Sequence, residues 1–178
     1  TAIKDKHVAR FGSLFQEFEQ QLNGQKEQEL HRFRSQAAEQ LASLQFPSRR
    51  DEDYKYTSFT RLLNQDYALP VATQVDPQAL AKLRVDGVEA IELVFINGLF
   101  DASQSSMNQL PSGLTITPID QAVNASGSKH TVQHYLEQHA TSSNPFIALN
   151  TSFATSGIFI HVAKNAIIER PVHFIHYN

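Results

Sequence analysis

The spacing of apolar residues changes near Ala90, and this change limits the fold more than any other feature of the sequence. Before Ala90, apolar side chains recur three or four positions apart, which is the period of one face of an α-helix. After it, short and dense apolar runs alternate with turn residues such as Asn97-Gly98, a pattern typical of β-strands joined by tight turns. The sequence therefore predicts an α+β protein that begins with helices.

Two amphipathic helices are expected at the start of the chain. The first apolar stripe comprises Val8, Phe11, Leu14, Phe15, Phe18 and Leu22. The second comprises Leu30, Phe33, Ala37, Leu41 and Leu44. Because Asn23-Gly24 lies between the stripes and favours a helix end, we expect an antiparallel helical hairpin in which each helix covers the other's stripe. Aromatic rings on such stripes stabilise a core by their burial, so we assign them no chemistry.

Proline and capping residues predict where other helices begin and end. Phe46-Pro47 ends the second helix, because proline disfavours helical geometry in the residue before it. Thr57 or Ser58 is a candidate cap for a short helix that carries Phe59, Leu62 and Leu63. Three further helices are expected, over about 77–84 after Asp76, over 131–139, and from Asn144-Pro145 to Phe153 with Gly157 closing it.

Strands are expected in the second half of the chain. The run 91–96 ends in the turn Asn97-Gly98, and Leu99 and Phe100 begin the return strand. Pro111-Ser112-Gly113 forms a second turn before a short strand. The remaining assignments are a strand over 114–117, a loop over 120–129, and three β segments over 157–162, 166–168 and 171–176.

The three C-terminal β segments resemble coils of a solenoid. A solenoid coil pairs with the coils above and below it and cannot bury its inner face alone, so we expect the sequence to stop inside a domain. The predicted organisation has three parts. They are an N-terminal helical domain over 1–86, a mixed α/β segment over 87–156 that leads into the core, and the start of a truncated β-helix core over 157–178.

Composition argues against several classes of protein. The sequence contains no cysteine, which excludes disulfides, thiolate metal sites, cysteine nucleophiles and cysteine-held iron-sulfur clusters from this stretch. A net charge of -3, from 15 basic and 18 acidic residues, offers no electrostatic footprint for nucleic acid. The first residues are too charged for a signal peptide, and no apolar run approaches the ~18 residues of a membrane span. We expect a cytoplasmic protein that binds neither nucleic acid nor membrane.

Five histidines are weighed as metal ligands, and none is assigned to a site. His130 and His134 lie four apart on an expected helix, as two zinc ligands do, but the sequence places no third ligand near them. His173 and His176 are three apart in an expected strand, so their side chains point to opposite faces. His161 is expected to be a solvated strand residue.

A mixed run of charges occupies positions 49–55. Such runs are usually solvated or paired locally, with binding of a partner as the alternative. We expect the rings of Tyr54 and Tyr56 to pack onto the domain while Glu52 and Lys55 stay in water. The sequence contains no glycine-rich phosphate loop, no nucleophile elbow and no paired carboxylates on facing strands. We therefore assign no catalytic, cofactor-binding or metal residue and expect no enzymatic activity.

Residues 47–57, Pro-Ser-Arg-Arg-Asp-Glu-Asp-Tyr-Lys-Tyr-Thr, resemble the N-terminal signature of SufD-type proteins, in the SufB/SufD family of iron-sulfur cluster assembly. Tyr54 stands where the signature has tryptophan and retains an aromatic ring. Further stretches resemble the family in the same order along the chain. They are 93–98 with Phe100, 146–150 with Phe153 and Gly157, and 157–162 with 168–172.

The resemblance implies a right-handed parallel β-helix core flanked by helical ends, and a scaffold without an enzyme's active site. Its implied partners, in a SufBCD complex, are a SufB-type paralogue and a SufC-type ABC ATPase, with a homodimer as a further option. An iron-sulfur cluster is implied for the full complex and not for this chain. The family's cluster-related and ATPase-docking residues would lie beyond Asn178, so none is transferred.

Two other functions are weighed beside the scaffold. One is a fragment of a polysaccharide-active β-helix enzyme, although the C-terminal segments offer mainly Lys164, Glu169 and Arg170 to line a groove. The other is a stand-alone helical adaptor domain, which the order of the matching stretches argues against. The sequence that follows Asn178 would separate the three.

Overall fold

A computed structural model of the chain describes residues 5–22 and 28–178. The backbone forms two compact units, and each unit joins two separate stretches of the chain. Unit 1 contains the chain up to Leu69 together with Gln133–Ala154, and unit 2 contains Pro70–Val132 together with Thr155–Asn178. The segments predicted from the sequence, 1–86, 87–156 and 157–178, are by contrast each continuous.

Unit 1 is helical. Its elements are α1 (Lys6–Gln21), α2 (Glu29–Ser43), the 3₁₀ turn η2 (Glu52–Tyr54), α3 (Thr60–Leu63) and α7 (Pro145–Ser152), while α6 (Lys129–Ala140) begins in unit 2 and continues into unit 1. The helix expected from Asn144-Pro145 is confirmed, with the Asn144 side chain accepting from the backbone N–H of Phe146 at 2.9 Å. That helix ends at Ser152, before the predicted stop at Gly157. The short helix α3 is confirmed, but Phe59 occupies its N-cap and neither Thr57 nor Ser58 does.

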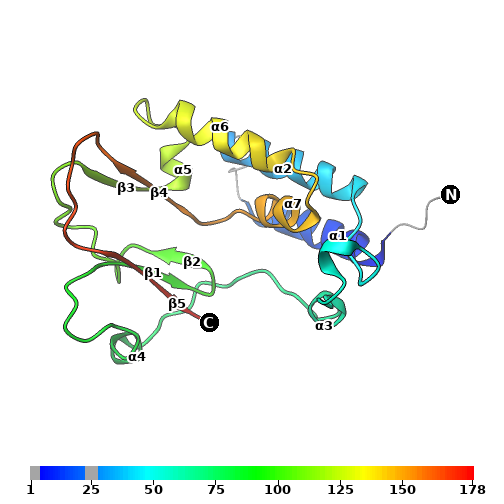
Figure 1. The fold of residues 1–178 in the computed structure, drawn as a ribbon, viewed down its shortest axis with the longest axis horizontal. Coiled ribbons are helices and arrows are strands. Elements are labelled where there is room, and N and C mark those ends of the chain that lie inside the picture. Colours follow the sequence, from blue (N-terminus) through cyan, green and yellow to red (C-terminus); the bar gives the residue numbers. More distant parts are fainter. Residues whose placement is uncertain (1–4, 23–27) are drawn as a thin grey trace. The chain divides into compact units, whose positions relative to one another are not determined.

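Both predicted stripes are buried, and a third helix helps to cover them. Leu30, Phe33 and Ala37 on α2 are fully buried. The helices α1 and α2 contact each other as expected, but the predicted hairpin is incomplete, because α7 also lies along α2 (Figure 1). Ala148 of α7 joins the cluster that contains Val8 and Leu41. The predicted stop at Asn23-Gly24 lies outside the described residues.

Unit 2 carries the strands. Its elements are α4 (Pro77–Ala81), β1 (Ile91–Ile96), β2 (Leu99–Asp101), β3 (Leu114–Pro118), α5 (Ile119–Ala122), β4 (Ile158–Val162) and β5 (Val172–Tyr177). The hairpin of β1 and β2 is confirmed, and Asn97 and Gly98 adopt positive φ angles of 50° and 77°, as a tight turn between antiparallel strands requires. The helix after Asp76 is also confirmed, although it ends at Ala81. The predicted loop over 120–129 is wrong at its start, where α5 forms, and at its end, where α6 begins.

Two small sheets pack face to face in unit 2. One has the order β2-β1-β5, with β5 parallel to β1, and the other pairs β3 with β4 antiparallel. Their shared core contains Ile91, Leu93, Phe95, Leu114 and Ile116. The predicted β segments in β4 and β5 are thus confirmed as strands, but they belong to different sheets. A β-helix coil does not appear among the described residues and stays a prediction.

The segment 166–168 is not a strand, which corrects the sequence prediction. A turn over 163–166 leads into this segment, in which the Ala166 N–H donates to the carbonyl of Ala163 at 3.0 Å and Asn165 has a φ of 66°, and residues 167–168 are irregular. This turn packs against Gly113, whose φ is 84°. A Cβ atom at Gly113 would lie 2.6 Å from the Cβ of Ala166, so only glycine permits the approach.

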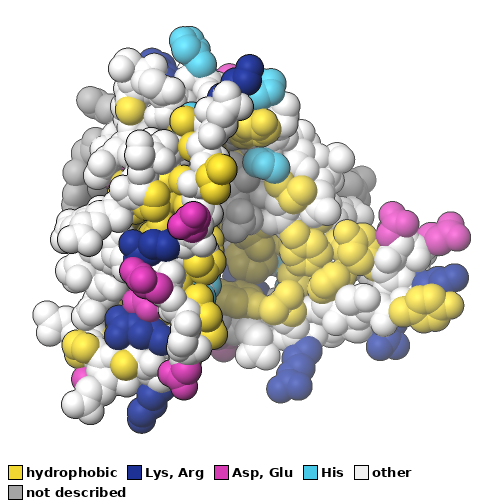
Figure 2. Space-filling view, turned by 60° about the vertical axis from the view of Figure 1, so that its left-hand side comes forward, with side chains coloured by type: hydrophobic (Ala, Val, Ile, Leu, Met, Phe, Trp, Pro, Cys, Tyr) yellow, Lys and Arg dark blue, Asp and Glu magenta, His cyan; other side chains and the backbone are white. Residues whose placement is uncertain are grey.

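The surface of unit 2 carries charges of both signs. Arg84 pairs with Glu92 at 2.9 Å and Arg170 with Glu89 at 3.7 Å, and basic and acidic side chains are interleaved on one face in Figure 2. An uninterrupted basic stripe, which nucleic acid would require, is not seen on that face. Within the described ranges, none of the helices is both long and apolar enough to cross a membrane.

Candidate protein-interaction site

The charged segment 47–57 of unit 1 is held in shape by its own hydrogen bonds. The backbone N–H and the hydroxyl of Ser48 both donate to Oδ2 of Asp51, at 2.7 and 3.0 Å. The N–H of Arg50 donates to the Ser48 hydroxyl at 3.2 Å. The backbone and side-chain hydrogen bonds from Ser48 favour the ionised carboxylate, so they lower the pKa of Asp51 below its usual value of 3.8. The first half of the segment is therefore a closed polar loop.

Aromatic packing fixes the second half of the segment. The ring of Tyr54, in η2, meets the ring of Phe59 edge-on at 5.5 Å. Phe59 and Phe46 both contact Phe146 of α7, at centroid distances of 4.7 and 5.2 Å. Offset and edge-on ring pairs of this kind stabilise a core beyond the burial of their area. The prediction that Tyr54 packs onto the domain is confirmed, and the aromatic ring at the signature position has a structural role.

Tyr56 does not pack, which makes the prediction for this residue wrong. Its side chain is 90% exposed, and its nearest described partner is the Lys55 ammonium, 5.0 Å from the ring centre. Tyr54 and Tyr56 are two positions apart, and they would share one face only if the backbone were extended. The turn closed by the Thr57 N–H and the Tyr54 carbonyl, at 2.8 Å, breaks that alternation. An exposed aromatic side chain thus stands on a loop that is held by its own contacts.

Asp5 joins this segment to the first helix. Its Oδ1 accepts from the backbone N–H of His7 at 2.8 Å, which caps α1, and its Oδ2 accepts from the backbone N–H of Phe46 at 3.1 Å. The Asp5 carboxylate therefore accepts hydrogen bonds both from the N-terminus of α1 and from the residue just before the segment. Sequence reasoning did not single out Asp5, although an acid just before an apolar helix period is a capping signal.

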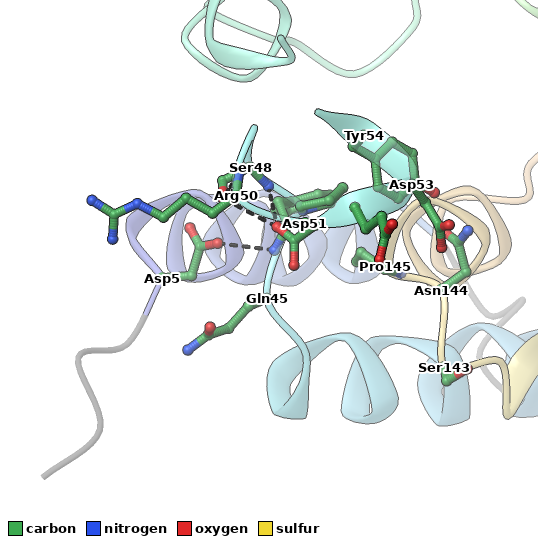
Figure 3. Close-up of a pocket in the computed structure, with 13 residues that line it drawn as sticks. Asp5, Gln45, Ser48, Arg50, Asp51, Asp53, Tyr54, Ser143, Asn144 and Pro145 are labelled. Carbon is green, nitrogen blue, oxygen red and sulfur yellow. Dashed lines mark hydrogen bonds between the residues drawn. The ribbon is translucent and has the colours of Figure 1, made fainter. Parts of the chain in front are cut away.

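A hollow of about 960 Å³ lies on one side of the segment. Figure 3 places Asp53 and Tyr54 near Asn144 and Pro145 in this hollow, whereas Arg50 extends away from them on the side of Asp5. Its lining is rich in carboxylates, from Asp5, Asp51, Glu52 and Asp53. As predicted, the run 49–55 is largely solvated, apart from the Ser48–Asp51 contact and the half-buried Tyr54.

The five histidines weighed as metal ligands do not come together. His130 and His134 are both exposed on α6, and Nε2 of His134 lies 3.0 Å from Nε2 of Gln138. His176 stacks on Phe95 at 5.0 Å while His173 pairs in register with Glu92, so the two lie on opposite faces as expected.

His161 is exposed and stacks on Phe159. In the described parts of the chain, no three His, Asp or Glu side chains gather as a metal site would need. Taken with the absence of cysteine, these residues do not fit an iron-sulfur cluster, and we derive no cluster chemistry from them.

The family described as SufBD protein N-terminal region matches residues 5–174. The chain belongs to this family. A similar protein is an iron-sulfur cluster assembly SufBD family protein of Synechocystis sp., which is 28% identical over 142 residues. The match covers 80% of this chain and 31% of that relative, so the SufBD chain described here spans about a third of the length of the curated protein it matches.

Membership confirms the resemblance inferred from residues 47–57. The matched range contains all the described residues of unit 1 and most of unit 2, from Asp5 before α1 to Phe174 of β5. It includes Asp5 and the 143–145 loop, which line the hollow beside the signature segment. The residues that build the candidate site therefore all lie within the family region.

Proposed function

We propose that this SufBD chain is the N-terminal part of a SufD-type scaffold subunit in a cytoplasmic iron-sulfur cluster assembly complex. It acts by protein-protein contact, with a SufB-type paralogue and a SufC-type ABC ATPase as partners, and it is not itself an enzyme. The cluster is the cargo of the assembly. Family membership supports the assembly role, and the partners come from the resemblance of residues 47–57 to the SufD-type signature.

The main support for the interaction role is the conformation of the signature segment, residues 47–57. Its backbone is held by internal hydrogen bonds and the ring of Tyr54 is held against Phe59, whereas Tyr56 and most of the charged side chains face solvent. A surface whose shape is already set loses little conformational entropy on binding, which favours association. Tyrosine and arginine are also enriched among the hot-spot residues of protein interfaces.

The β-helix is part of the same proposal. β5 lies at the edge of its sheet and runs parallel to β1, which is the pairing that successive coils of a parallel β-helix repeat. The outer edge of β5 has no strand partner among the described residues. We infer that a further parallel strand covers this edge in the longer protein. A structure of the intact protein with β5 still at a sheet edge would contradict this inference.

Co-purification tests the proposed function. The intact protein should be expressed with a SufB-type paralogue and a SufC-type ATPase, with an affinity tag on only one of the three. We expect all three to elute together at a fixed ratio through a second, size-based column. Elution of the tagged protein without the others, under conditions in which each is folded, would refute the proposal.

A further inference from the structure

A second hollow, of about 500 Å³, lies against the signature segment. Its described lining residues all belong to unit 1. Its apolar part is formed by Phe46 and Leu63, which are buried, and by Pro47 and Phe59, which are half-buried. These four side chains come from two stretches of the chain, 46–47 and 59–63. Hollows of this volume accommodate drug-sized ligands and short peptide segments.

Three cationic side chains border this hollow. Lys6 comes from the first turn of α1, and Arg49 and Arg50 come from the signature segment. All three are exposed, and none forms an ion pair with another described residue. His7 adds a fourth basic group, which is half-buried. The charges of Lys6, Arg49 and Arg50 are therefore available to a ligand.

Acidic side chains are fewer than basic ones in the described lining of this hollow. Asp5 is the one carboxylate in the described lining, and its two oxygens accept from the backbone N–H groups of His7 and Phe46. Asp51, next to Arg50 in the chain, lines the other hollow and accepts from Ser48. The basic side chains therefore outnumber Asp5 at the rim of the smaller hollow. The carboxylates of the segment line the larger hollow, which Arg50 also borders.

The apolar floor is fixed before any ligand arrives. Phe46 and Phe59 both pack on Phe146, at 5.2 and 4.7 Å, and Phe46 also contacts Phe11 at 5.8 Å. The guanidinium of Arg10 donates to the carbonyl of Leu63 at 2.6 Å, which ties α3 to α1. A preformed floor means that binding need not order these side chains.

We propose that this hollow binds an acidic segment of a protein partner, with one apolar or aromatic side chain inserted against Phe46, Phe59 and Leu63. Carboxylates on either side of that anchor pair with Lys6, Arg49 and Arg50. Charge complementarity selects an acidic partner, and the apolar floor selects a peptide with an anchor over a simple anion. The proposal rests on the proposed function, because it supplies the chemistry by which the signature segment would meet a partner.

Nucleic acid is the less suitable polyanion for this surface. Its phosphate chain would extend beyond the cationic rim onto Asp51, Glu52 and Asp53, which line the adjacent hollow. The chain also has a net charge of -3, which opposes long-range attraction of a polyanion. A short acidic segment avoids the first penalty, because it ends within the reach of the basic side chains, and its few charges make the second penalty smaller than for a nucleic acid.

Fluorescence anisotropy with the intact protein tests this inference. The probe is a labelled hexapeptide, EDLFDE, with EDSGDE and KKLFKK as matched peptides that lack the anchor or reverse the charge. A ten-nucleotide oligothymidylate is the nucleic-acid comparison. We expect EDLFDE to bind with a dissociation constant below about 1 mM and the other three at least about tenfold more weakly. Binding should weaken between about 50 mM and about 500 mM salt, because the rim is exposed.

Variants assign the binding to the hollow. Arg49→Glu combined with Arg50→Glu should weaken EDLFDE binding by about tenfold or more, and Arg49→Lys should retain most of it. Lys164→Glu, an exposed cation in unit 2, is the matched control and should have no effect. Circular dichroism checks that the exposed substitutions leave the fold intact. Peptide binding that is absent, or equal in the double variant and the wild type, would overturn the inference, as would preference for the oligonucleotide.

The same proteins separate this inference from the proposed function. Suppose that the wild type and the Arg49→Glu, Arg50→Glu variant assemble equally well with the partners and that EDLFDE does not bind. The proposed binding site is then refuted, and the proposed scaffold function is retained. If EDLFDE binds as expected but the wild type assembles with neither partner, the scaffold assignment fails instead. Loss of both peptide binding and assembly in the double variant is the result that we expect.

Discussion

Removal of the Asp5 carboxylate should destabilise unit 1 more than removal of an exposed acid. Asp5 accepts two backbone hydrogen bonds, from His7 at 2.8 Å and from Phe46 at 3.1 Å, and both are part-buried. Substitution by alanine leaves both N–H groups without their acceptor. The free energy of unfolding therefore falls by two separate contributions, one from the helix cap and one from the 46–57 segment.

The magnitude follows from these two contacts. Loss of an N-cap side chain costs about 1 kcal/mol, and an unsatisfied part-buried N–H costs about 1 to 2 kcal/mol, so Asp5→Ala should cost about 2 to 3 kcal/mol. Asp5→Asn separates the two contacts, because asparagine caps a helix as well as aspartate but its amide nitrogen cannot accept from Phe46. We expect Asp5→Asn to cost about 1 kcal/mol.

Urea unfolding followed by circular dichroism at a helix wavelength measures both variants, since unit 1 holds α1, α2 and α7. Asp66→Ala, an exposed acid in the same unit, is the control and should change the unfolding free energy by less than about 0.5 kcal/mol. Equal stability of Asp5→Ala and the control would refute the role of the carboxylate. Equal losses for Asp5→Ala and Asp5→Asn would refute the division into two contacts.

Three further predictions follow from the sequence and the structure. Leu41→Asp should unfold unit 1, because it places an unpaired charge at a buried site, whereas the exposed change Gln28→Ala should leave the melting curve unchanged. The Asp51 carboxyl should titrate below pH 3.8 in carbon-detected NMR. Because the folded-state pKa of Asp51 is lowered, its contacts contribute to folding stability above the unfolded-state pKa, and this contribution is lost as the pH falls through the folded-state pKa. Ser48→Ala should move the titration midpoint of Asp51 upward. Finally, the purified chain should neither hydrolyse ATP nor turn brown on anaerobic reconstitution with iron and sulfide, and cluster absorbance would contradict that expectation.

Local signals account for the elements that the sequence predicted well. The period of α1 and α2, the Asn144-Pro145 helix start and the Asn97-Gly98 turn each depend on residues close together in the chain. Long-range partners were not predictable in this way. The contact of α2 with α7 and the parallel pairing of β1 with β5 join segments far apart in sequence, and no local pattern specifies them.

Buried polar residues were also not predicted, although the position of Arg34 on the apolar stripe of α2 indicates its burial. Arg34 is 2% exposed and donates from Nε to the carbonyl of Ala154 at 2.6 Å. Its position, four after Leu30 and three before Ala37, lies on the apolar stripe of α2. A charged residue at such a position indicates a buried partner, but it does not indicate which one.

The candidate site was predictable only in part. The signature at 47–57 was found from sequence, and so was the packing of Tyr54. The hollows beside it needed Asp5, Lys6 and the 143–145 loop, which only the fold brings to the segment. The exposure of Tyr56 depends on the turn after η2, and the prediction for that residue failed because strand alternation does not apply there.

Amide hydrogen exchange of the signature segment tests the central claim most directly. The intact protein should be labelled alone and after assembly with its SufB-type and SufC-type partners, and exchange compared across residues 47–57. We expect exchange in this segment to slow on assembly, while exchange in the partly exposed turn 163–166 of unit 2 serves as the internal reference. Unchanged exchange across 47–57 in a fully assembled complex would contradict the claim that this segment meets a partner.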